Sequence, residues 1–219
     1  MPDDREVLDG LRRLLGNVHL YIGLQRGLGT DRVRYWCLDE AGLEPGHAVL
    51  DVGCGPAYYL DRLPPGVTYH GFDTNEPYLA YARSRFGDRG EFHRGRFTRD
   101  CLANLPAFDV VLLFGLLHHL SDDDCTALLD VTSRGLAPGG RLISVDPCTH
   151  PGQGRVSRWL AVNDRGEFVR APEAFDALAR RSFAEVDSEI RGDLMRVPYS
   201  QYVMRMSRPI AGAARANPS

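Results

Sequence analysis

The residues best placed to do chemistry begin with Asp51, which ends a short apolar run and is followed by Gly53 and Gly55. This pattern predicts a strand, a tight turn and a helix. Glycines in such a turn let the backbone bend sharply and let a ligand approach it, and the first N–H groups of the helix have no intrahelical partner. The stretch therefore predicts a cradle for a small molecule, although a plain structural turn would show the same pattern.

A second acidic residue, Asp73, ends the next strand-like run, about 20 residues after the glycines. At this spacing a carboxylate accepts hydrogen bonds from the hydroxyls of an adenosine ribose. The pyrophosphate fingerprint G-x-G-x-x-G is incomplete, because Tyr58 stands at its last position. Asp51 is badly placed for a phosphate and well placed for a cationic ligand, which favours S-adenosylmethionine over NAD.

Two more candidates follow later strand-like runs. His118 and His119 come after the fourth predicted strand, and Asp146 ends the fifth. The carboxyl ends of parallel strands meet at one edge, so we expect His118 to act as a general base while Asp146 holds its imidazole and stabilises the cation. A packing role for the histidines is the alternative, and His150 in the next loop is a second candidate base.

The elements that must position these groups alternate along the chain. Strand-like and helix-like segments in turn are typical of a doubly wound parallel sheet, which binds ligands outside the carboxyl ends of its strands. Residues 155–170 form a variable segment. The predicted strands are 48–52, 68–72, 91–94, 109–114, 141–146, 184–191 and 199–206, and the helices are 57–63, 76–86, 122–135 and 173–181.

Three helical patterns stand ahead of the first strand, where they cannot join the parallel sheet, and we interpret the first two as a lid over the ligand edge. Tyr21 and Gln25 share a face of the second helix and are expected to reach into the site, which makes Tyr21 a candidate catalytic residue. The helices span 5–15, 18–28 and 31–41, and the chain divides into a lid (1–45), a ligand-binding core (46–210) and a disordered tail (211–219).

Four motifs occur in an order that resembles the class I S-adenosylmethionine-dependent methyltransferases, in particular those that act on small molecules and natural products. The resemblance implies an α/β fold with a Rossmann-like doubly wound seven-stranded sheet, whose last strand is antiparallel. Ala57 stands where many members have a third glycine, and Arg96 where many have an acid near the adenine. The motifs are Asp51-Val52-Gly53-Cys54-Gly55, Asp73, residues 108–113 and residues 136–142.

The resemblance also implies S-adenosyl-L-methionine as cofactor and a small-molecule acceptor, with O-methylation ahead of N- or C-methylation. A base is needed only where the acceptor must lose a proton. A non-methylating cyclase that binds the same cofactor and an NAD-dependent oxidoreductase are the rival interpretations. The implied catalytic residues are His118, Asp146 and Tyr21, and the implied cofactor contacts are Asp51, Gly53, Gly55, Pro56, Asp73, Thr74, Phe97, Phe114, Gly115 and His119.

The amino-acid composition excludes further classes of protein function. The net charge of −3 gives no electrostatic footprint for nucleic acid, and all 26 basic residues are Arg, which excludes a P-loop or Schiff-base lysine. The five cysteines form no C-x-x-C pair and Asp122-Asp123-Asp124 suits a helix start, so no metal site is expected. The predictions are a cytoplasmic monomer or homodimer that binds neither nucleic acid nor membrane.

Overall fold

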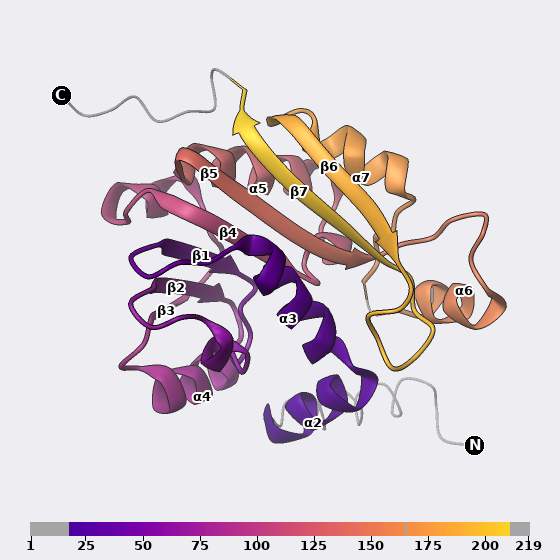
Figure 1. The fold of residues 1–219 in the computed structure, drawn as a ribbon, viewed down its shortest axis with the longest axis horizontal. Coiled ribbons are helices and arrows are strands. Elements are labelled where there is room, and N and C mark those ends of the chain that lie inside the picture. The colour runs from indigo at the N-terminus through magenta and orange to yellow at the C-terminus, as the bar shows by residue number, and fades with distance from the viewer. Residues whose placement is uncertain (1–17, 165, 211–219) are drawn as a thin grey trace.

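The computed structural model describes residues 18–164 and 166–210, and a seven-stranded sheet forms its centre (Figure 1). The sheet has the order β3-β2-β1-β4-β5-β7-β6. The strands are β1 Ala48–Val52, β2 Thr68–Asp73, β3 Glu91–Arg94, β4 Phe108–Phe114, β5 Leu136–Pro147, β6 Phe183–Arg191 and β7 Gln201–Pro209.

Strand pairing confirms the predicted α/β sheet with its antiparallel last strand. The pairs β1–β2, β1–β4, β2–β3 and β4–β5 are parallel, and β7 is antiparallel to both β5 and β6. The chain leaves β1 for β2 on one side and later places β4 on the other side. The carboxyl ends of β1 and β4 therefore flank the point where such sheets bind ligands.

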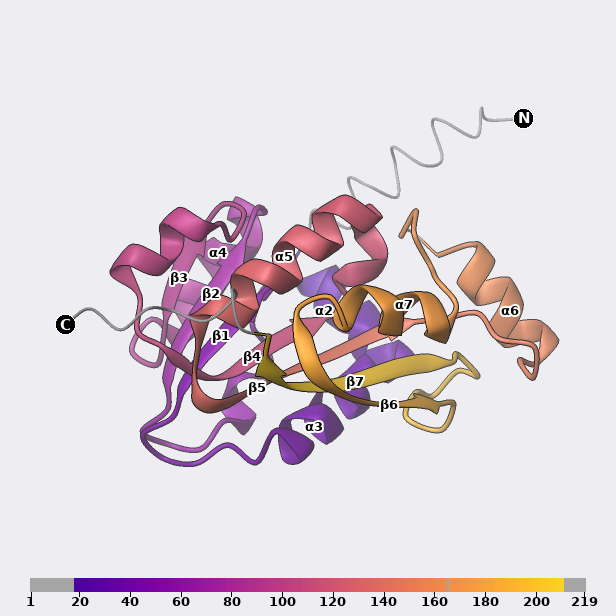
Figure 2. The same cartoon turned by 90° about the horizontal axis from the view of Figure 1, so that it is seen from above.

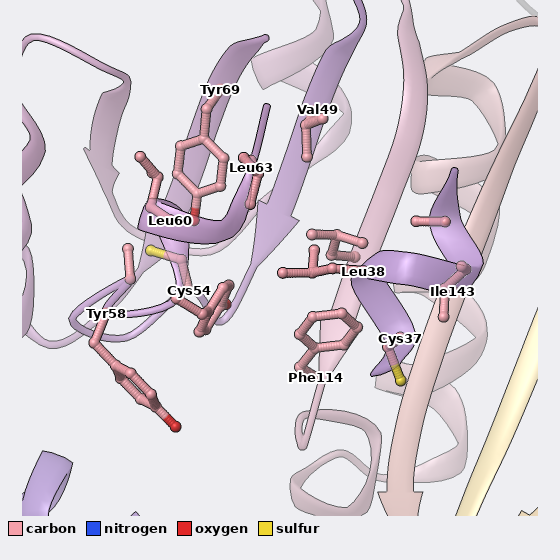
Figure 3. Close-up of a cluster of buried hydrophobic side chains, with 14 of the residues drawn as sticks. Cys37, Leu38, Val49, Cys54, Tyr58, Leu60, Leu63, Tyr69, Phe114 and Ile143 are labelled. Atoms are coloured by element: carbon pink, nitrogen blue, oxygen red, sulfur yellow. The ribbon is translucent and has the colours of Figure 1, made fainter. Parts of the chain in front are cut away.

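Helices cover both faces of this sheet (Figure 2). Alternating strand residues point to opposite faces, so Val49 packs in one core cluster, with residues of α3 and α4, and Leu50 in the other, with residues of α5 and α7. Figure 3 shows Cys37 and Leu38 of α3 beside Ile143 of β5 in the first cluster. The helices are α2 Val18–Leu28, α3 Thr30–Ala41, α4 Glu76–Phe86, α5 Asp122–Gly135, α6 Arg155–Val162 and α7 Pro172–Ala179.

The two described N-terminal helices lie where the sequence predicts them. Arg196, between β6 and β7, donates its backbone N–H to the carbonyl of Leu28 (3.0 Å), and the chain turns at Gly29 with φ +84°. A Cβ on Gly29 would lie 2.6 Å from the Arg196 nitrogen, so this close approach requires glycine. The helix at 5–15 and the tail at 211–219 lie outside the described residues, and the lid–core division at residue 45 stays a prediction.

The predicted helix at 57–63 is wrong. Only a 3-10 turn forms there, at Leu60–Arg62. Ala57 adopts φ +47°, which no helix accommodates, and Leu63 is extended ahead of Pro64, as a residue before proline prefers. Within the variable segment 155–170 the structure adds α6, and β5 begins at Leu136, earlier than predicted. No helix in the described residues is long and apolar enough to cross a membrane.

Candidate active site

A cavity of about 490 Å³ lies at the carboxyl edge of the parallel strands. Its floor comes from the turn after β1 and from the ends of β2, β4 and β5, and its walls come from α2, α3, the segment after α6 and the β6–β7 connection. The cavity therefore occupies the position where a doubly wound sheet binds its ligand.

The glycine turn after β1 is fixed by the neighbouring strand. The backbone N–H groups of Gly53 and Cys54 both donate to the carbonyl of Phe72, at 2.8 and 3.1 Å. Gly53 and Gly55 have φ of +79° and +56°, and a Cβ on Gly53 would press on the Leu116 side chain at 3.2 Å. The turn therefore needs glycine for its conformation and presents bare backbone to the cavity.

Asp73 is tied to the same turn. One carboxylate oxygen accepts from the N–H of Gly55 (2.8 Å) and the other from the N–H of Asn75 (2.7 Å). Asn75 in turn caps α4 by accepting from the Tyr78 N–H. Backbone donors thus hold the carboxylate at the cavity, where the sequence predicted a ribose contact.

Asp51 lies behind the turn, fully buried, and does not contribute to the cavity lining that the sequence expected of it. The hydroxyls of Tyr59 (2.5 Å) and Tyr69 (2.6 Å) both donate to its Oδ2. Burial raises the pKa of Asp51 to about 6, against the opposing effect of these hydrogen bonds. Asp51 thus fixes the positions of Tyr59 and Tyr69 behind the glycine turn.

Arg34 of α3 is a cavity residue that sequence reasoning missed. Its guanidinium lies over the rings of Tyr58 and Tyr59, with 5.1 and 5.4 Å to the centroids, and it donates to the Tyr58 hydroxyl. Nothing in the helical pattern of residues 31–41 distinguishes this arginine from the 25 others in the chain. Folding alone brings its charge to the site.

His118 lies between two carboxylates. Its Nδ1 donates to Oδ1 of Asp146 at 2.8 Å, and its Nε2 lies 3.2 Å from Oδ1 of Asp164. The backbone N–H of His118 also donates to Asp146 (3.1 Å), so the predicted pair forms. Burial acts to lower the pKa of His118, but hydrogen bonds and charge from the two carboxylates outweigh it and raise the pKa to about 9. The ring is therefore an imidazolium at neutral pH in this arrangement.

Asp164 and Tyr199 are two further site residues that the sequence did not predict. The Tyr199 hydroxyl donates to Oδ2 of Asp164 (2.6 Å), and the Gly166 N–H donates to Oδ1 (2.8 Å). Burial acts to raise the pKa of Asp164, but the hydrogen bonds from His118, Tyr199 and Gly166 hold it well below its usual range. The only local signal was an Asp two residues before a Gly, which indicates a turn and no chemistry.

Of the remaining predicted residues, two lie outside the cavity lining and the others belong to it. Thr74 is exposed and lies outside the cavity lining. Phe97 is buried in the core cluster that holds Leu50, with its ring centroid 5.1 Å from that of Phe72. Tyr21 lines the cavity and packs on Tyr78, at 4.9 Å between centroids, so the structure groups it with the Asp73 end. Pro56, Phe114, Gly115 and His119 line the cavity together with Gly53, Gly55 and Asp73.

Two further candidates have structural partners. Nε2 of His150 lies 3.2 Å from the Ser200 hydroxyl, outside the cavity lining. Arg96, at the position expected near the adenine, lies 3.8 Å from Asp124 across the protein surface.

Comparison with known proteins finds matches for the same segment. Residues 49–140, which hold the glycine turn, Asp73 and the two histidines, match the family model described as a methyltransferase domain. The chain is 32% identical to Methyltransferase GfsG of Streptomyces halstedii over 123 residues, which are 53% of this chain and 43% of that protein. It spans less than half the length of the curated relatives it matches, 43% of the first and 24% of the next two.

Two solved structures share the fold. The [4+2]-cyclase SpnF superposes with a TM-score of 0.65 at 18% identity, over 83% of this chain and 82% of that one. The mitomycin 7-O-methyltransferase MmcR superposes with a TM-score of 0.63 at 20% identity, over 90% of this chain and 57% of that one. At these identities the likeness concerns the fold.

Proposed function

We propose that this chain, which carries a methyltransferase domain of the class I S-adenosylmethionine-dependent family, methylates a small-molecule acceptor at oxygen, ahead of nitrogen or carbon. One observation carries the proposal. A buried histidine with carboxylates on both ring nitrogens shares a cavity with the glycine turn and Asp73. The match to a methyltransferase domain supports methyl transfer over the NAD-dependent alternative.

The residues at the β1–β2 end fit the cofactor. When bound, S-adenosylmethionine supplies a methyl group already activated by a sulfonium. Asp73 would hold the ribose hydroxyls, because its carboxylate is pinned by two N–H donors at the cavity. Gly53 and Gly55 leave the backbone open beside it. Arg34 is the cation suited to the carboxylate of the cofactor's amino-acid part.

The residues at the β4–β5 end would handle the acceptor. As long as Asp164 contacts Nε2, His118 holds its proton and cannot act as a base. An acceptor hydroxyl that takes the place of Asp164 removes one of the two carboxylates that raise the pKa of His118. The ring can then release its Nε2 proton and afterwards accept the hydroxyl proton there, while Asp146 keeps Nδ1–H oriented. The displaced proton passes to solvent, because the hydrogen bonds that hold the pKa of Asp164 well below its usual range make it a poor proton acceptor.

The net charge of the chain and the aromatic lining of the cavity favour a small acceptor. The net charge of −3 provides no general attraction for a polyanion such as RNA. Aromatic side chains of Tyr21, Tyr58, Phe114 and Tyr199 line the cavity and suit a flat, apolar scaffold. A natural-product acceptor fits this lining.

The test has two stages. First, S-adenosylhomocysteine is expected to raise the melting temperature by an amount that grows with the logarithm of its concentration above the dissociation constant, and NAD to leave it unchanged. Second, the chain is incubated with S-adenosylmethionine and phenols, with matched anilines and unsubstituted rings as controls. Mass spectrometry should show one added methyl on the hydroxyl compounds alone. Methylation of the anilines or of ring carbon alone would overturn the choice of oxygen.

A second candidate is a non-methylating reaction on the same fold, of the kind for which the [4+2]-cyclase SpnF is named. The observation that favours it is the His118 contact with two carboxylates, which gives a hydrogen-bond donor in place of a base. The two candidates differ in product mass. A rearranged product of unchanged mass, with the cofactor recovered intact, would support the second.

A further inference from the structure

Three side chains with metal-ligating atoms converge at the edge of the sheet. They are His70 of β2 and Glu91 and His93 of β3. Nδ1 of His70 lies 3.4 Å from Nε2 of His93 and 3.6 Å from Oε2 of Glu91, and the last two atoms are 3.8 Å apart. The three atoms thus form a nearly equilateral triangle.

Strand register produces this triangle. β2 and β3 are parallel, with His70 opposite Glu91 and Phe72 opposite His93. Side chains two apart on a strand share a face, so Glu91 and His93 both point to the face of His70. The pairing that builds the sheet therefore sets the three ligand atoms side by side.

The two imidazoles are held in place by packing. His70 is 4% exposed and meets the Phe108 ring edge-on at 5.8 Å between centroids. The His93 ring stacks on Phe72 at 4.5 Å. Glu91 is mostly exposed and can adjust its position. Such a site has two oriented ligands and one adaptable ligand.

The spacing suits one tetrahedral ion. Bonds of about 2.0–2.2 Å at tetrahedral angles put neighbouring ligand atoms roughly 3.3–3.6 Å apart. The observed 3.4, 3.6 and 3.8 Å need shifts of a few tenths of an ångström. Without an ion, each imidazole carries at most one N–H at these atoms, so at least one of the three contacts has no hydrogen bond.

We propose that His70, Glu91 and His93 bind one Zn²⁺-type transition-metal ion, with the fourth position open to water. Two imidazoles and a carboxylate are ligands that Zn²⁺ accepts readily. The ion would pin β3, which pairs only with β2 in the described sheet, to its neighbour. Its role would be structural, because His70 lies on the opposite face of β2 from Asp73, which lines the cavity.

No metal site was expected from the sequence. Cysteine pairs and acidic runs were the signals sought there, whereas these ligands come from two strands with residues 71–90 between them. Only the parallel register of β2 and β3 shows that His70 meets Glu91 and His93.

The test uses the full chain, stripped with a chelator and titrated with Zn²⁺ alone. One equivalent should bind and raise the melting temperature, and Co²⁺ should give the absorption bands of a tetrahedral site. His93→Ala should weaken Zn²⁺ binding at least tenfold and abolish these bands, and Glu91→Gln should weaken it less. His47→Ala is the matched control, since His47 lies outside the cluster and should leave Zn²⁺ affinity unchanged.

Two results would overturn the proposal. One is a chain that binds no Zn²⁺ at micromolar concentration. The other is binding that persists at full affinity in His93→Ala, which would assign the ion to other residues. Both variants alter partly exposed side chains, and far-UV circular dichroism without metal verifies that they fold. Because the readouts are metal affinity and melting temperature, failure here is separate from failure of the methyltransferase assay.

Discussion

At the β1–β2 end of the cavity the key carboxylate is held by backbone N–H groups, whereas at the β4–β5 end the key imidazole is held by other side chains. Asp73 accepts from Gly55 and Asn75, which belong to turns fixed by the sheet. His118 depends on Asp146, which is buried on β5, and on Asp164, which follows α6. Under the proposed function, the first end would present a fixed shape to the cofactor, and the second would exchange a partner of His118 when an acceptor binds.

The two carboxylates on His118 repeat this contrast on a smaller scale. Asp146 is 1% exposed and also accepts the backbone N–H of His118, so it stays in place. The Asp164 side chain is 21% exposed and is held by Tyr199 and one loop N–H. Under the proposed function, Asp146 would orient the ring throughout, and Asp164 would occupy Nε2 until an acceptor replaces it.

The largest expected effect is at the side-chain-held end. His118→Ala should lower kcat by about 10²–10⁴ at neutral pH and leave S-adenosylhomocysteine affinity nearly unchanged, since general-base help is of that size. Asp146→Asn should cost no more, and the double variant should fall well short of the product of the two losses, because the pair acts as a unit. Steady-state kinetics from pH 6 to 9 measures this.

The control for that series is His150→Ala, which removes a histidine hydrogen-bonded to Ser200 outside the cavity lining. It should retain activity. A loss below tenfold in His118→Ala, with an unaltered pH profile, would make His118 a binding or packing residue. Oxygen should then yield to nitrogen or carbon as the methylated atom.

The backbone-held end gives the next effect. Asp73→Ala should weaken S-adenosylhomocysteine binding by about 1.5–3 kcal/mol, the cost of a hydrogen bond to a charged group, while kcat at saturating cofactor changes little. Isothermal titration calorimetry measures it, with Asp88→Ala as a control for loss of an exposed carboxylate. Equal affinities of the two variants would remove Asp73 from the cofactor site and with it the contrast between the two ends.

How far the site residues could be predicted from the sequence also differs between the two ends of the cavity. Gly53, Gly55 and Asp73 lie close together in the sequence, so the glycine turn read together with the spacing of Asp73 predicts a ligand site. The His118–Asp146 pair also was predictable, because each residue follows or ends a strand whose carboxyl end reaches the same edge. Asp164 and Tyr199 meet only through the packing of two irregular connections, and no spacing rule relates them.

The errors have equally local causes. Alternation in β1 puts Asp51 on the face of Val49, but the pattern does not show that the hydroxyls of Tyr59 and Tyr69 bind its carboxylate on the buried side. The helix expected at 57–63 fails at Ala57, whose positive φ is set by the turn and not by its own preference. Both errors occur where tertiary contacts override local pattern.

A smaller effect, on the pH dependence of kcat/KM, should distinguish the role of Asp164 from that of Asp146. Because Asp164 is one of the groups that raise the pKa of His118 to about 9, kcat/KM should rise with pH along a limb near that value. Asp164→Asn removes this negative charge, so the pKa of His118 falls and the limb of kcat/KM should move to lower pH. The limb of kcat, which reports the acceptor complex, should move less. An unmoved kcat/KM limb would contradict the role of Asp164 at Nε2.

The smallest expected effect is at the outermost contact of this group. Tyr199→Phe deletes the hydroxyl that donates to Oδ2 of Asp164 at 2.6 Å and keeps the ring in the cavity wall. With one donor lost, the pKa of Asp164 rises toward its usual range, and the carboxylate leaves Nε2 more easily. The variant should raise kcat/KM for the acceptor only a few-fold, about 0.5–1.5 kcal/mol for one hydrogen bond, and leave cofactor affinity unaltered. Combined with Asp164→Asn it should have no additional effect, because Tyr199 acts through that carboxylate, whereas a loss of kcat/KM in both backgrounds would show that the Tyr199 hydroxyl contacts the acceptor directly.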